Sequence, residues 1–460
     1  MIVHVRNFGK IEKADINLSD LIIFVGENNS GKTYLMQLIY GLFSFFGELG
    51  TNLNNDMNTV FREKKTQNGE ITICAHDIDF YNSFQNALND YIMDNMDKII
   101  ESTFHTNALS IESLSVEFQP LADDYSITYN GPVQNEEDGI FKHYSLEKNR
   151  KLLSSLGFGE TMTDDIIDRF LSKHLFSVLM EDLIGLSINK SNQRRNEKSF
   201  IYFPASRSGM MLLYSNYLSH DVKNSINDIG DYSIEQAEVK SIENEYGLTE
   251  PVYNFLMFLL NHKYSEIASK QNHALISFIE NSIINGHLEK VGNAMIYKPD
   301  NSEQLLPIQL SSSLVSELAP LYQALTGIHR ISYIMYDEIE TCQHPTKQIQ
   351  LARLIIRMLN SGYKMIVSSH SDTMVTAINN LITLSYKERK SELLDKLNYT
   401  EEDILQHANV NAYQFVIQNG RTNVVEVPNH FSVGVGFNFD LFNTANQKIY
   451  DDAVSLSEVD

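Results

Sequence analysis

The stretch that decides the fold is GENNSGKT, residues 26–33, which fits the pattern G-x-x-x-x-G-K-[ST]. In this pattern the glycines allow backbone N–H groups to close on phosphate oxygens, the lysine reaches the β- and γ-phosphates, and the final hydroxyl binds Mg²⁺. The sequence therefore predicts a phosphate-binding loop. Its predicted nucleotide-binding residues are Gly26, Asn28, Asn29, Ser30, Gly31, Lys32 and Thr33, and the last of these is also a predicted Mg²⁺ ligand.

The segments on either side of this loop supply the strand and the helix that the pattern requires. Residues 21–25 form a continuous apolar run of the kind found in buried strands. After the loop, Leu35, Leu38, Ile39 and Leu42 recur at the i, i+3, i+4, i+7 spacing of a helix. The predicted order is strand, glycine-containing loop and helix, with the positive end of the helix dipole facing the phosphates.

Two further strands end in residues suited to phosphate chemistry. Ser332–Tyr336 is followed by two carboxylates, of which Asp337 is expected to hold Mg²⁺, directly or through water, and Glu338 to polarise a water against the γ-phosphate. Residues 363–371 (YKMIVSSHS) form a strand ending at His370, whose neutral imidazole could orient the attacking water. Because parallel α/β sheets bind ligands at the carboxyl ends of their strands, we expect these groups to meet.

The composition is typical of a globular protein with hydrophobic cores, and it argues against nonspecific binding to nucleic acid. The chain has 460 residues, and its 36 Lys and Arg against 59 Asp and Glu give a formal net charge of −23. This balance repels a nucleic-acid backbone unless basic residues gather on one face. Two distant cysteines and the absence of a long apolar run favour a cytoplasmic protein without a membrane span.

Together these motifs resemble those of the ABC-type ATPases of the SMC and OLD group. The resemblance rests on the phosphate loop near the N-terminus, the SSH strand, and a DE-x-E-x-x-x-HP string made of Asp337, Glu338, Glu340, His344 and Pro345. It implies an α/β P-loop ATPase head with a mainly parallel sheet, and ATP and Mg²⁺ as ligands. It also implies that Glu338 and His370 act in catalysis, and that two subunits close around two nucleotides.

The same resemblance assigns a role to Ile308–Leu318 (IQLSSSLVSEL), which lies upstream of the carboxylate-bearing strand. In the family, a serine-containing signature at a helix start crosses the dimer interface and contacts the partner's γ-phosphate. Ser312 and Ser313 are the matching residues. Leu314 stands where the family has a glycine, which makes close approach of the backbone to phosphate less easy. An ordinary serine-capped helix is the alternative interpretation of this stretch.

We expect five segments along the chain. Residues 1–50 carry the N-terminal part of the ATPase head with the phosphate loop, 51–150 a β-rich arm, and 151–300 a helical insertion that contains the strand IYFPASR. Residues 301–385 carry the signature, the carboxylate-bearing strand and the switch histidine, and 386–460 carry C-terminal strands and an acidic tail.

Arg207, in the stretch IYFPASRSG, is a candidate for more than one role. The stretch resembles one that is frequent in small defence-associated ATPases, and it lies where related ATPases place a glutamine-containing loop that senses Mg²⁺. No glutamine stands here, so Ser206 and Arg207 are the candidates. The guanidinium of Arg207 could neutralise phosphate or bind a carboxylate at an interface, and a buried structural ion pair explains it equally well.

The resemblance extends to the ATPase subunits of two-component anti-phage systems, such as the Septu ATPase, retron-associated ATPases and the ATPase of the PARIS system. It rests on the compact single-head layout, the IYFPASRSG stretch, the LSSSLVSEL variant and a tyrosine-containing C-terminal strand. It implies an ATP-gated homo-oligomer, a dimer or larger, that scaffolds and controls a separate nuclease or toxin, such as an HNH or TOPRIM protein.

Three other classes of ATPase compete with this interpretation. A transporter subunit would carry an LSGGQ-like signature, which is missing here. An SMC-like repair or chromosome protein needs coiled-coil arms, and the helical periodicity over Lys151–Ile188 and Met211–Ser282 never persists as heptads. A one-chain OLD nuclease needs a TOPRIM domain. The residues around Glu426 mimic only its first element, because Pro428 follows where a glycine belongs and no Asp-x-Asp comes later.

Two charged segments are candidates for partner contacts. Lys190, Arg194, Arg195 and Lys198 could contact DNA or an acidic partner, and a solvated loop is the alternative explanation. The tail Asp451–Asp460 mixes acids with apolar residues and could dock on a basic surface, although an acidic end needs no such role.

Overall fold

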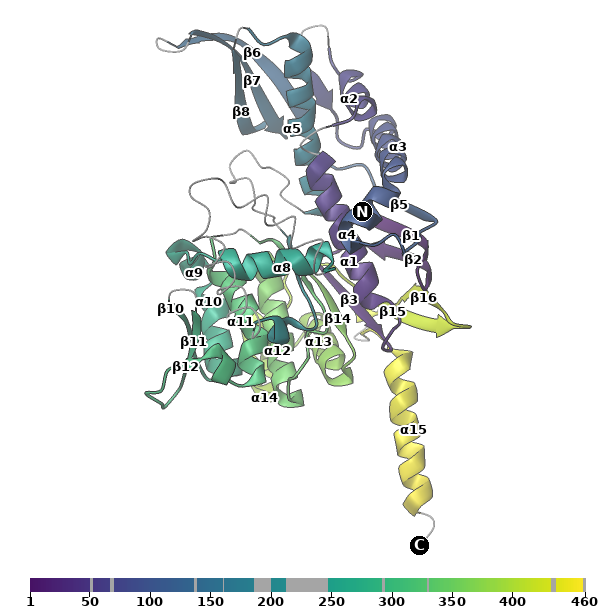
Figure 1. Ribbon diagram of the computed structural model, residues 1–460, viewed down its shortest axis with the longest axis vertical. Helices are drawn as coiled ribbons and strands as arrows, with labels where there is room; N and C mark the ends of the chain where they lie inside the picture. The colour runs from purple at the N-terminus through teal and green to yellow at the C-terminus, as the bar shows by residue number, and fades with distance from the viewer. Residues whose placement is uncertain are drawn as a thin grey trace. The chain divides into compact units, whose positions relative to one another are not determined.

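The computed structural model describes residues 1–49, 53–66, 70–135, 139–159, 161–185, 200–211, 247–291, 294–328, 331–431 and 436–457. The chain, traced in Figure 1, divides into two compact units. The first consists of Met1–Leu18, Gly41–Ser102 and Thr106–Ser199, and the second of Ser19–Tyr40, Thr103–His105 and Phe200–Asp460. The phosphate loop and the strands that end in Asp337-Glu338 and His370 all belong to the second unit.

The second unit is built on a mainly parallel sheet that contains the strand order β16-β15-β3-β14-β13-β9. Strands β15, β3, β14, β13 and β9 run parallel, whereas β16 pairs antiparallel with β15. Every residue of β3, β9 and β13 is buried, which explains their continuous apolar sequences. The predicted α/β class is confirmed. The strand bounds are β3 Leu21–Gly26, β9 Phe200–Phe203, β13 Tyr333–Tyr336, β14 Lys364–Ser369, β15 Val410–Gln418 and β16 Arg421–Glu426.

The register of this sheet brings the ends of three strands together. Val25 of β3 pairs with Ser369 of β14, and Tyr336 of β13 pairs with Val367 of the same strand. Because the three strands are parallel, their carboxyl ends lie at one edge of the sheet. The residues that follow β3, β13 and β14 therefore start from neighbouring positions.

Helices and a small second sheet complete the second unit (Figure 1). Helix α12 packs on α13 and on β14, and α8 packs on β9. In the small sheet, β11 pairs antiparallel with both β10 and β12. The bounds are α8 Glu250–Asn261, α9 Glu266–Gln271, α10 His273–Phe278, η1 Ile279–Ile284, β10 Gly286–Val291, β11 Ala294–Pro299, β12 Leu306–Pro307, η2 Ile308–Leu310, α11 Ser313–Thr326, α12 Pro345–Asn360, α13 Asp372–Ser385, α14 Lys390–Leu397, η3 Glu401–Asp403 and α15 Asp440–Ser457. Helix α1, Lys32–Leu49, begins in this unit.

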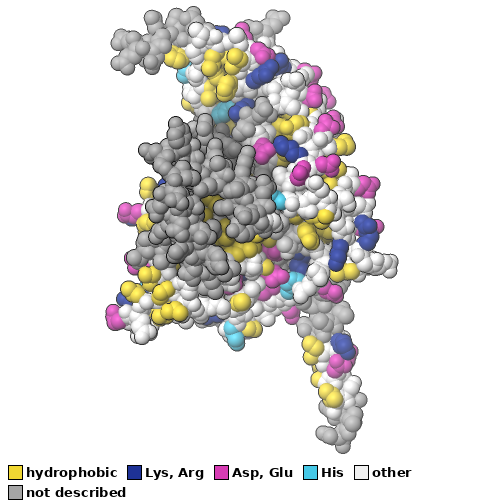
Figure 2. All heavy atoms as spheres, viewed as in Figure 1, with side chains coloured by type: hydrophobic (Ala, Val, Ile, Leu, Met, Phe, Trp, Pro, Cys, Tyr) yellow, Lys and Arg dark blue, Asp and Glu magenta, His cyan; other side chains and the backbone are white. Residues whose placement is uncertain are grey.

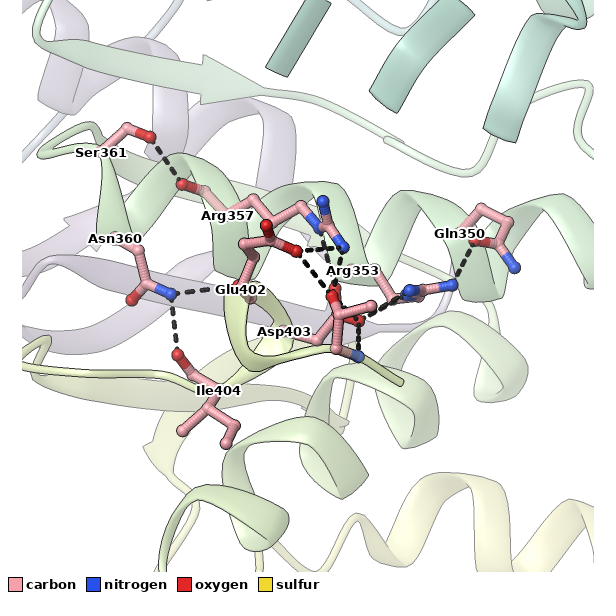
Figure 3. Close-up of polar contacts among 9 residues, drawn as sticks. Gln350, Arg353, Arg357, Asn360, Ser361, Glu402, Asp403 and Ile404 are labelled. Atoms are coloured by element: carbon pink, nitrogen blue, oxygen red, sulfur yellow. Dashed lines mark hydrogen bonds and ion pairs between the residues drawn. The ribbon is translucent and has the colours of Figure 1, made fainter. Parts of the chain in front are cut away.

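A buried ion-pair cluster fixes α12 to the short turn η3 (Figure 3). Asp403, whose side chain is fully buried, accepts hydrogen bonds from Arg353 Nη2 at 2.7 Å and from Arg357 Nε at 2.8 Å. Asn360 Nδ2 adds a hydrogen bond to the carbonyl of Ile404 at 2.7 Å. Burial raises the pKa of the Asp403 carboxyl, but the hydrogen bonds from the two guanidinium groups outweigh burial and leave this pKa below its ordinary value.

The first unit combines two sheets with helices. One sheet contains the order β5-β1-β2 and the other the order β4-β6-β7-β8, and the neighbouring strands in both orders pair antiparallel. Helix α2 packs on α3 and α5, and α3 packs on β5. The bounds are β1 Ile2–Phe8, β2 Ile11–Asn17, α2 Asn55–Arg62, β4 Ile71–Ile73, α3 Ile78–Asp94, α4 Met96–Phe104, β5 Ser113–Glu117, β6 Tyr125–Asn135, β7 Gly139–Lys148, β8 Lys151–Gly159 and α5 Asp164–Ile184.

Side chains of α3 cover the outer side of strand β5. Asn89 Nδ2 donates to the carbonyl of Val116 at 2.9 Å, and Asn89 Oδ1 accepts from the N–H of the same residue at 2.8 Å. Gln85 Oε1 accepts from the N–H of Phe118 at 2.8 Å. The backbone N–H and carbonyl of Val116 in β5, and the N–H of Phe118 just after it, therefore find partners on a helix.

The first unit also holds more helix and one more strand than the sequence suggested. Helices α2, α3 and α4 lie within residues 51–150, where a β-rich arm was expected. Residues 151–159, for which helical periodicity was expected, form β8, paired with β7 through a turn at Asn149 and Arg150. Both turn residues have positive φ, 50° and 64°, which is the geometry of a tight hairpin.

The C-terminal helix α15 carries exposed apolar side chains, seen as yellow spheres in Figure 2. Ile449, Tyr450 and Leu456 are each more than half exposed. The helix includes most of the acidic tail predicted at Asp451–Asp460. Within the described ranges, no helix is long and apolar enough to cross a membrane.

Candidate functional site

The phosphate loop joins β3 to α1 through a backbone that requires glycine at both ends. A Cβ added to Gly26 would lie 2.7 Å from Phe415 Cβ and 3.1 Å from the Phe415 carbonyl oxygen, so the neighbouring strand β15 leaves no room for one. Gly31 has a φ of 100°, a conformation that side chains oppose. Asn29 has a φ of 60°, which asparagine tolerates better than most residues.

Lys32 is held inside this loop. Its Nζ donates to the carbonyls of Gly26 and Glu27, both at 2.9 Å, and lies 3.4 Å from Ser30 Oγ. The side chain is nearly buried. Burial lowers the pKa of Lys32 to about 8, against the opposing effect of nearby carboxylates. The two shortest hydrogen bonds of this ammonium group go to neutral carbonyl oxygens of its own loop, which it can exchange for phosphate oxygens.

Asp337, at the end of β13, lies directly opposite the start of α1. Its Oδ2 accepts from Thr33 Oγ1 at 2.7 Å and from the hydroxyl of Tyr202 at 3.0 Å, and its Oδ1 accepts from Ser368 Oγ. The carboxylate is 1% exposed. Burial raises the pKa of Tyr202 well above its ordinary value and the charge on Asp337 adds to this, so the phenol keeps its proton and donates. Gln37 of α1 donates to the same hydroxyl.

Glu338 adopts a backbone conformation that is rare for its type. Its φ is 44°, in the left-handed region, and its N–H donates to Ser368 Oγ at 2.8 Å. Its carboxylate Oε1 lies 3.3 Å from His370 Nε2, and both side chains are partly exposed. The structure thus places the two residues predicted to act in catalysis side by side.

His370 connects the carboxylate to the loop lysine. Its Nδ1 lies 3.4 Å from Lys32 Nζ, while its Nε2 faces Glu338. Because an ammonium group can only donate, a neutral imidazole with its proton on Nε2 satisfies both contacts. The N–H of His370 donates to Glu340 Oε1 at 2.5 Å. Glu340 therefore ties the turn after β13 to the end of β14.

Arg207 does not reach the solvent: its side chain is 0% exposed. Its Nη1 donates to the carbonyl of Asp337 at 2.7 Å, its Nη2 to the carbonyl of Glu338 at 3.1 Å, and its Nε pairs with Glu317 Oε2 at 2.7 Å. Of the roles considered from sequence, the structure shows the buried ion pair. Burial raises the pKa of the Glu317 carboxyl, and Arg207 acts in the opposite direction.

Ser312 and Ser313 lie at the N-terminus of α11. Ser312 is the N-cap, with its hydroxyl accepting from the N–H of Val315 at 3.4 Å, and both serines are exposed. Among the described residues, no hydrogen bond joins either serine to the phosphate loop. The structure therefore brings together the loop, Asp337, Glu338 and His370, but not the signature serines.

Several residues of this site were not identified from the sequence. Tyr202 and Gln37 orient Asp337, Ser368 contacts both Asp337 and Glu338, and Glu317 pairs with Arg207. Ser368 belongs to the SSH segment, so its neighbour His370 was a signal for it. For Tyr202 and Glu317 no local pattern exists, because their partners come from distant parts of the chain.

Two other candidates from the sequence are a basic segment and a strand glutamate. Lys190, Arg194, Arg195 and Lys198 lie outside the described residues. Glu426 ends β16 and accepts a hydrogen bond from Asn411 Nδ2 at 2.8 Å, the contact of an exposed strand residue. In the parts of the chain that the structure describes, no group of three or more His, Cys, Asp or Glu side chains is arranged to hold a metal ion.

One protein family and several solved structures resemble this chain. The model of the family described as AAA ATPase domain matches residues 1–375. The SMC head domain from Thermotoga maritima aligns at a TM-score of 0.31 with 11% identity, over 93% of this chain and 98% of that one. The SmcHead bound to the C-winged helix domain of ScpA aligns at 0.36 with 12% identity, over 94% and 99%.

A third structure is the Smc head domain with an extended coiled coil bound to the C-terminal domain of ScpA, derived from Pyrococcus furiosus. It aligns at a TM-score of 0.33 with 12% identity, over 93% of this chain and 95% of that one. No curated protein matches the chain.

Proposed function

This chain belongs to the AAA ATPase domain family and is an ATPase, and we propose that it is the ATP-hydrolysing subunit of a two-component anti-phage defence complex. In this proposal the subunits form a homo-oligomer whose interface is gated by ATP. The oligomer scaffolds and controls a separate effector, a nuclease or a toxin. We assign the destructive chemistry to the effector: among the residues that the structure describes, Glu426 belongs to no group of acidic side chains arranged to hold a metal ion, and it accepts a hydrogen bond from Asn411.

The position of Lys32 is the observation that carries the ATP site. Its ammonium group lies within 3.4 Å of the loop and of His370, where three strand ends converge. In the proposed reaction, residues 26–33 cradle the phosphates through their N–H groups and Lys32 binds the β- and γ-phosphates. Glu338 accepts a proton from the attacking water, and His370 contacts the γ-phosphate.

The donors beside the loop fit Mg²⁺. Thr33 Oγ1 and Asp337 Oδ2 are hard oxygen atoms 2.7 Å apart, and each described hydrogen bond to the buried Asp337 carboxylate comes from a hydroxyl group. Mg²⁺ keeps several waters and takes few protein ligands, so a hydroxyl, a carboxylate and phosphate oxygens are a suitable set. When bound there, the ion would neutralise charge on the β- and γ-phosphates.

The exposed start of α11 supports the oligomer. Ser312 and Ser313 present hydroxyl and N–H groups at a helix N-terminus, which favours phosphate. They make no hydrogen bond to the described loop of their own subunit, so we propose that they act on the nucleotide of a neighbour. Each subunit then contributes the loop to one site and the serines to another.

Mixing two inactive variants tests the shared site. Lys32→Ala removes the loop lysine, and Ser313→Arg blocks the approach of α11 to phosphate. In a mixed oligomer, one site combines an intact loop with an intact α11, so mixing should restore ATP hydrolysis, whereas each variant alone stays inactive. If the mixture hydrolyses ATP no faster than the separate variants, the site is not shared between subunits.

Light scattering of the protein with the product of its neighbouring gene tests the two-component role. We expect a discrete complex, with a mass that changes when Mg·ATP is added. Lys32→Ala protein should lose the nucleotide-dependent change and serves as the control. A monomer whose mass is unaffected by both the candidate effector and the nucleotide would refute the proposed complex while leaving the ATPase assignment untouched.

A further inference from the structure

The guanidinium group of Arg207 joins three elements that meet behind the ATP site. Arg207 follows β9, its carbonyl partners Asp337 and Glu338 follow β13, and its carboxylate partner Glu317 lies on α11. Nη1 also donates to the carbonyl of Pro204 at 3.1 Å. Nη1 and Nη2 thus donate to backbone carbonyls, and Nε forms the ion pair with Glu317.

The surroundings fix this side chain firmly. The guanidinium carbon lies 4.5 Å from the centre of the Tyr336 ring, and the hydroxyl of Tyr336 donates to the carbonyl of Glu317 at 3.2 Å. Arg207 and Glu317 are both 0% exposed. A buried charge pair of this kind holds its geometry because neither partner can turn to water. Lysine could not replace the arginine, since a single ammonium cannot make the same planar set of contacts.

The carbonyls of Asp337 and Glu338, both bound by Arg207, lie on either side of the left-handed backbone conformation that directs the Glu338 carboxylate. A positive φ at glutamate is strained and persists only where the surrounding contacts enforce it. The N–H of Glu338 is held by Ser368, and its carbonyl is held by Arg207. These two contacts fix the peptide groups on both sides of the residue, and they set the direction of its side chain toward His370.

Glu317 lies one turn beyond Ser313 on α11. We propose that Arg207 is a positioning residue that couples α11 to the left-handed turn at Glu338, so that a shift of α11 reorients the Glu338 carboxylate. The proposal rests on the role given above to Glu338 as the base. It assigns to Arg207 no contact with nucleotide. When a neighbouring subunit engages the start of α11, the Arg207–Glu317 pair carries that event to the carboxylate.

The test separates turnover from binding. Arg207→Lys and Glu317→Gln should lower kcat by roughly 10- to 100-fold, as small misplacements of a reacting group do. The affinity for Mg·ATP should change by less than about twofold, since only the chemical step loses stabilisation. Arg353→Lys is the matched control, because it alters another buried arginine–carboxylate pair, that with Asp403 in Figure 3, and should leave kcat unchanged.

A second arm places Glu317→Gln in the Glu338→Gln background. If Arg207 and Glu317 act through the Glu338 carboxylate, the double variant should turn over no slower than Glu338→Gln alone. An equal fractional loss in both backgrounds would overturn the coupling, as would a fall in ATP affinity that accounts for the slower rate. Glu338→Gln protein with unaltered turnover would instead refute the proposed base, so the two failures are distinguishable. Glu317→Gln gives the answer even if Arg207→Lys fails to fold.

Discussion

Thr33 Oγ1 donates a hydrogen bond to Asp337 Oδ2 across 2.7 Å, although 304 positions separate the two residues in the chain. The contact forms because β3 and β13 lie on either side of β14 in one sheet, so that the residues after them face each other. A hydroxyl and a carboxylate, two oxygen donors suited to Mg²⁺, thus lie side by side. Five expected outcomes follow from this arrangement and from the packing of the second unit.

Replacement of Lys32 by alanine should abolish measurable ATP binding. The variant loses an ammonium group whose hydrogen bonds to phosphate are each worth about 1.5–3 kcal/mol. It also loses the bonds by which Lys32 holds the carbonyls of Gly26 and Glu27. Isothermal titration with ATP and Mg²⁺ measures the effect, and unchanged affinity would show that residues 26–33 do not bind phosphate.

Replacement of Glu338 by glutamine should leave ATP binding intact and slow hydrolysis by about 10²- to 10⁴-fold, the usual contribution of a general base. The amide has nearly the same shape but cannot accept the proton. The backbone contacts of Glu338 to Ser368 and Arg207 do not involve its side chain and should survive. Single-turnover measurements of phosphate release with saturating Mg·ATP provide the rate, and hydrolysis at the normal rate would exclude Glu338 as the base.

Replacement of Gly26 by alanine should destabilise the fold by about 1–3 kcal/mol, the usual cost of forcing an extra carbon into a packed core. The new Cβ would meet Phe415 Cβ at 2.7 Å, so β3 or β15 must move. Because Gly26 also ends β3 at the loop, ATP affinity should fall as well. Gly47→Ala in α1 is the control: a Cβ there meets no atom within 4 Å, and alanine should stabilise the helix by a few tenths to about 1 kcal/mol.

Replacement of Asp403 by asparagine should lower the free energy of unfolding by about 3–5 kcal/mol, because it leaves two largely buried guanidinium groups without a counter-charge. Urea unfolding followed by circular dichroism at pH 7 measures the loss. A change below about 0.5 kcal/mol, the range of ordinary surface substitutions, would show that the cluster in Figure 3 adds no stability.

The same variant gives a pH dependence whose sign is fixed. The pKa of Asp403 is lower in the folded protein than in the unfolded chain, where a carboxyl titrates near about 3.9. The ionised carboxylate therefore contributes its stability above that value, and the contribution disappears as the pH falls through the folded pKa. The difference in stability between the natural protein and Asp403→Asn should shrink below about pH 4, and a difference that grows there would contradict the assignment.

Much of the fold of the second unit could be predicted, because the sequence of its elements indicates their secondary structure directly. Residues 21–25 are apolar throughout, and β3 is buried on both faces. The first unit was harder. Phe80, Phe84, Leu88 and Ile92 of α3 recur every four residues and are all buried, so a helical signal was present among polar residues that resemble a loop. For β8 no such signal exists, because pairing with β7 decides its structure.

The candidate site likewise has a part that could be predicted from the sequence and a part that could not. Part of the site lies in short motifs whose spacing indicates their chemistry. The residues of these motifs, which the structure brings together, are Lys32, Thr33, Asp337, Glu338 and His370. Contacts such as Tyr202 to Asp337 and Arg207 to Glu317 join residues more than a hundred positions apart. The sequence supports two roles for Arg207 equally well, a phosphate contact and an ion pair. Only the burial of its side chain decides between them.

The amide of Asn89 does for Val116 what a neighbouring strand would do, since it both accepts from the N–H and donates to the carbonyl. Strand β5 is the last in the order β5-β1-β2, and an open strand at that position invites another chain to extend the sheet. Asn89 occupies the outward groups of Val116, and Gln85 occupies the N–H of Phe118 just after the strand, so this part of the edge is protected from β-augmentation. In the oligomer proposed above, the backbone groups of Val116 are therefore not available for pairing with a strand of another subunit.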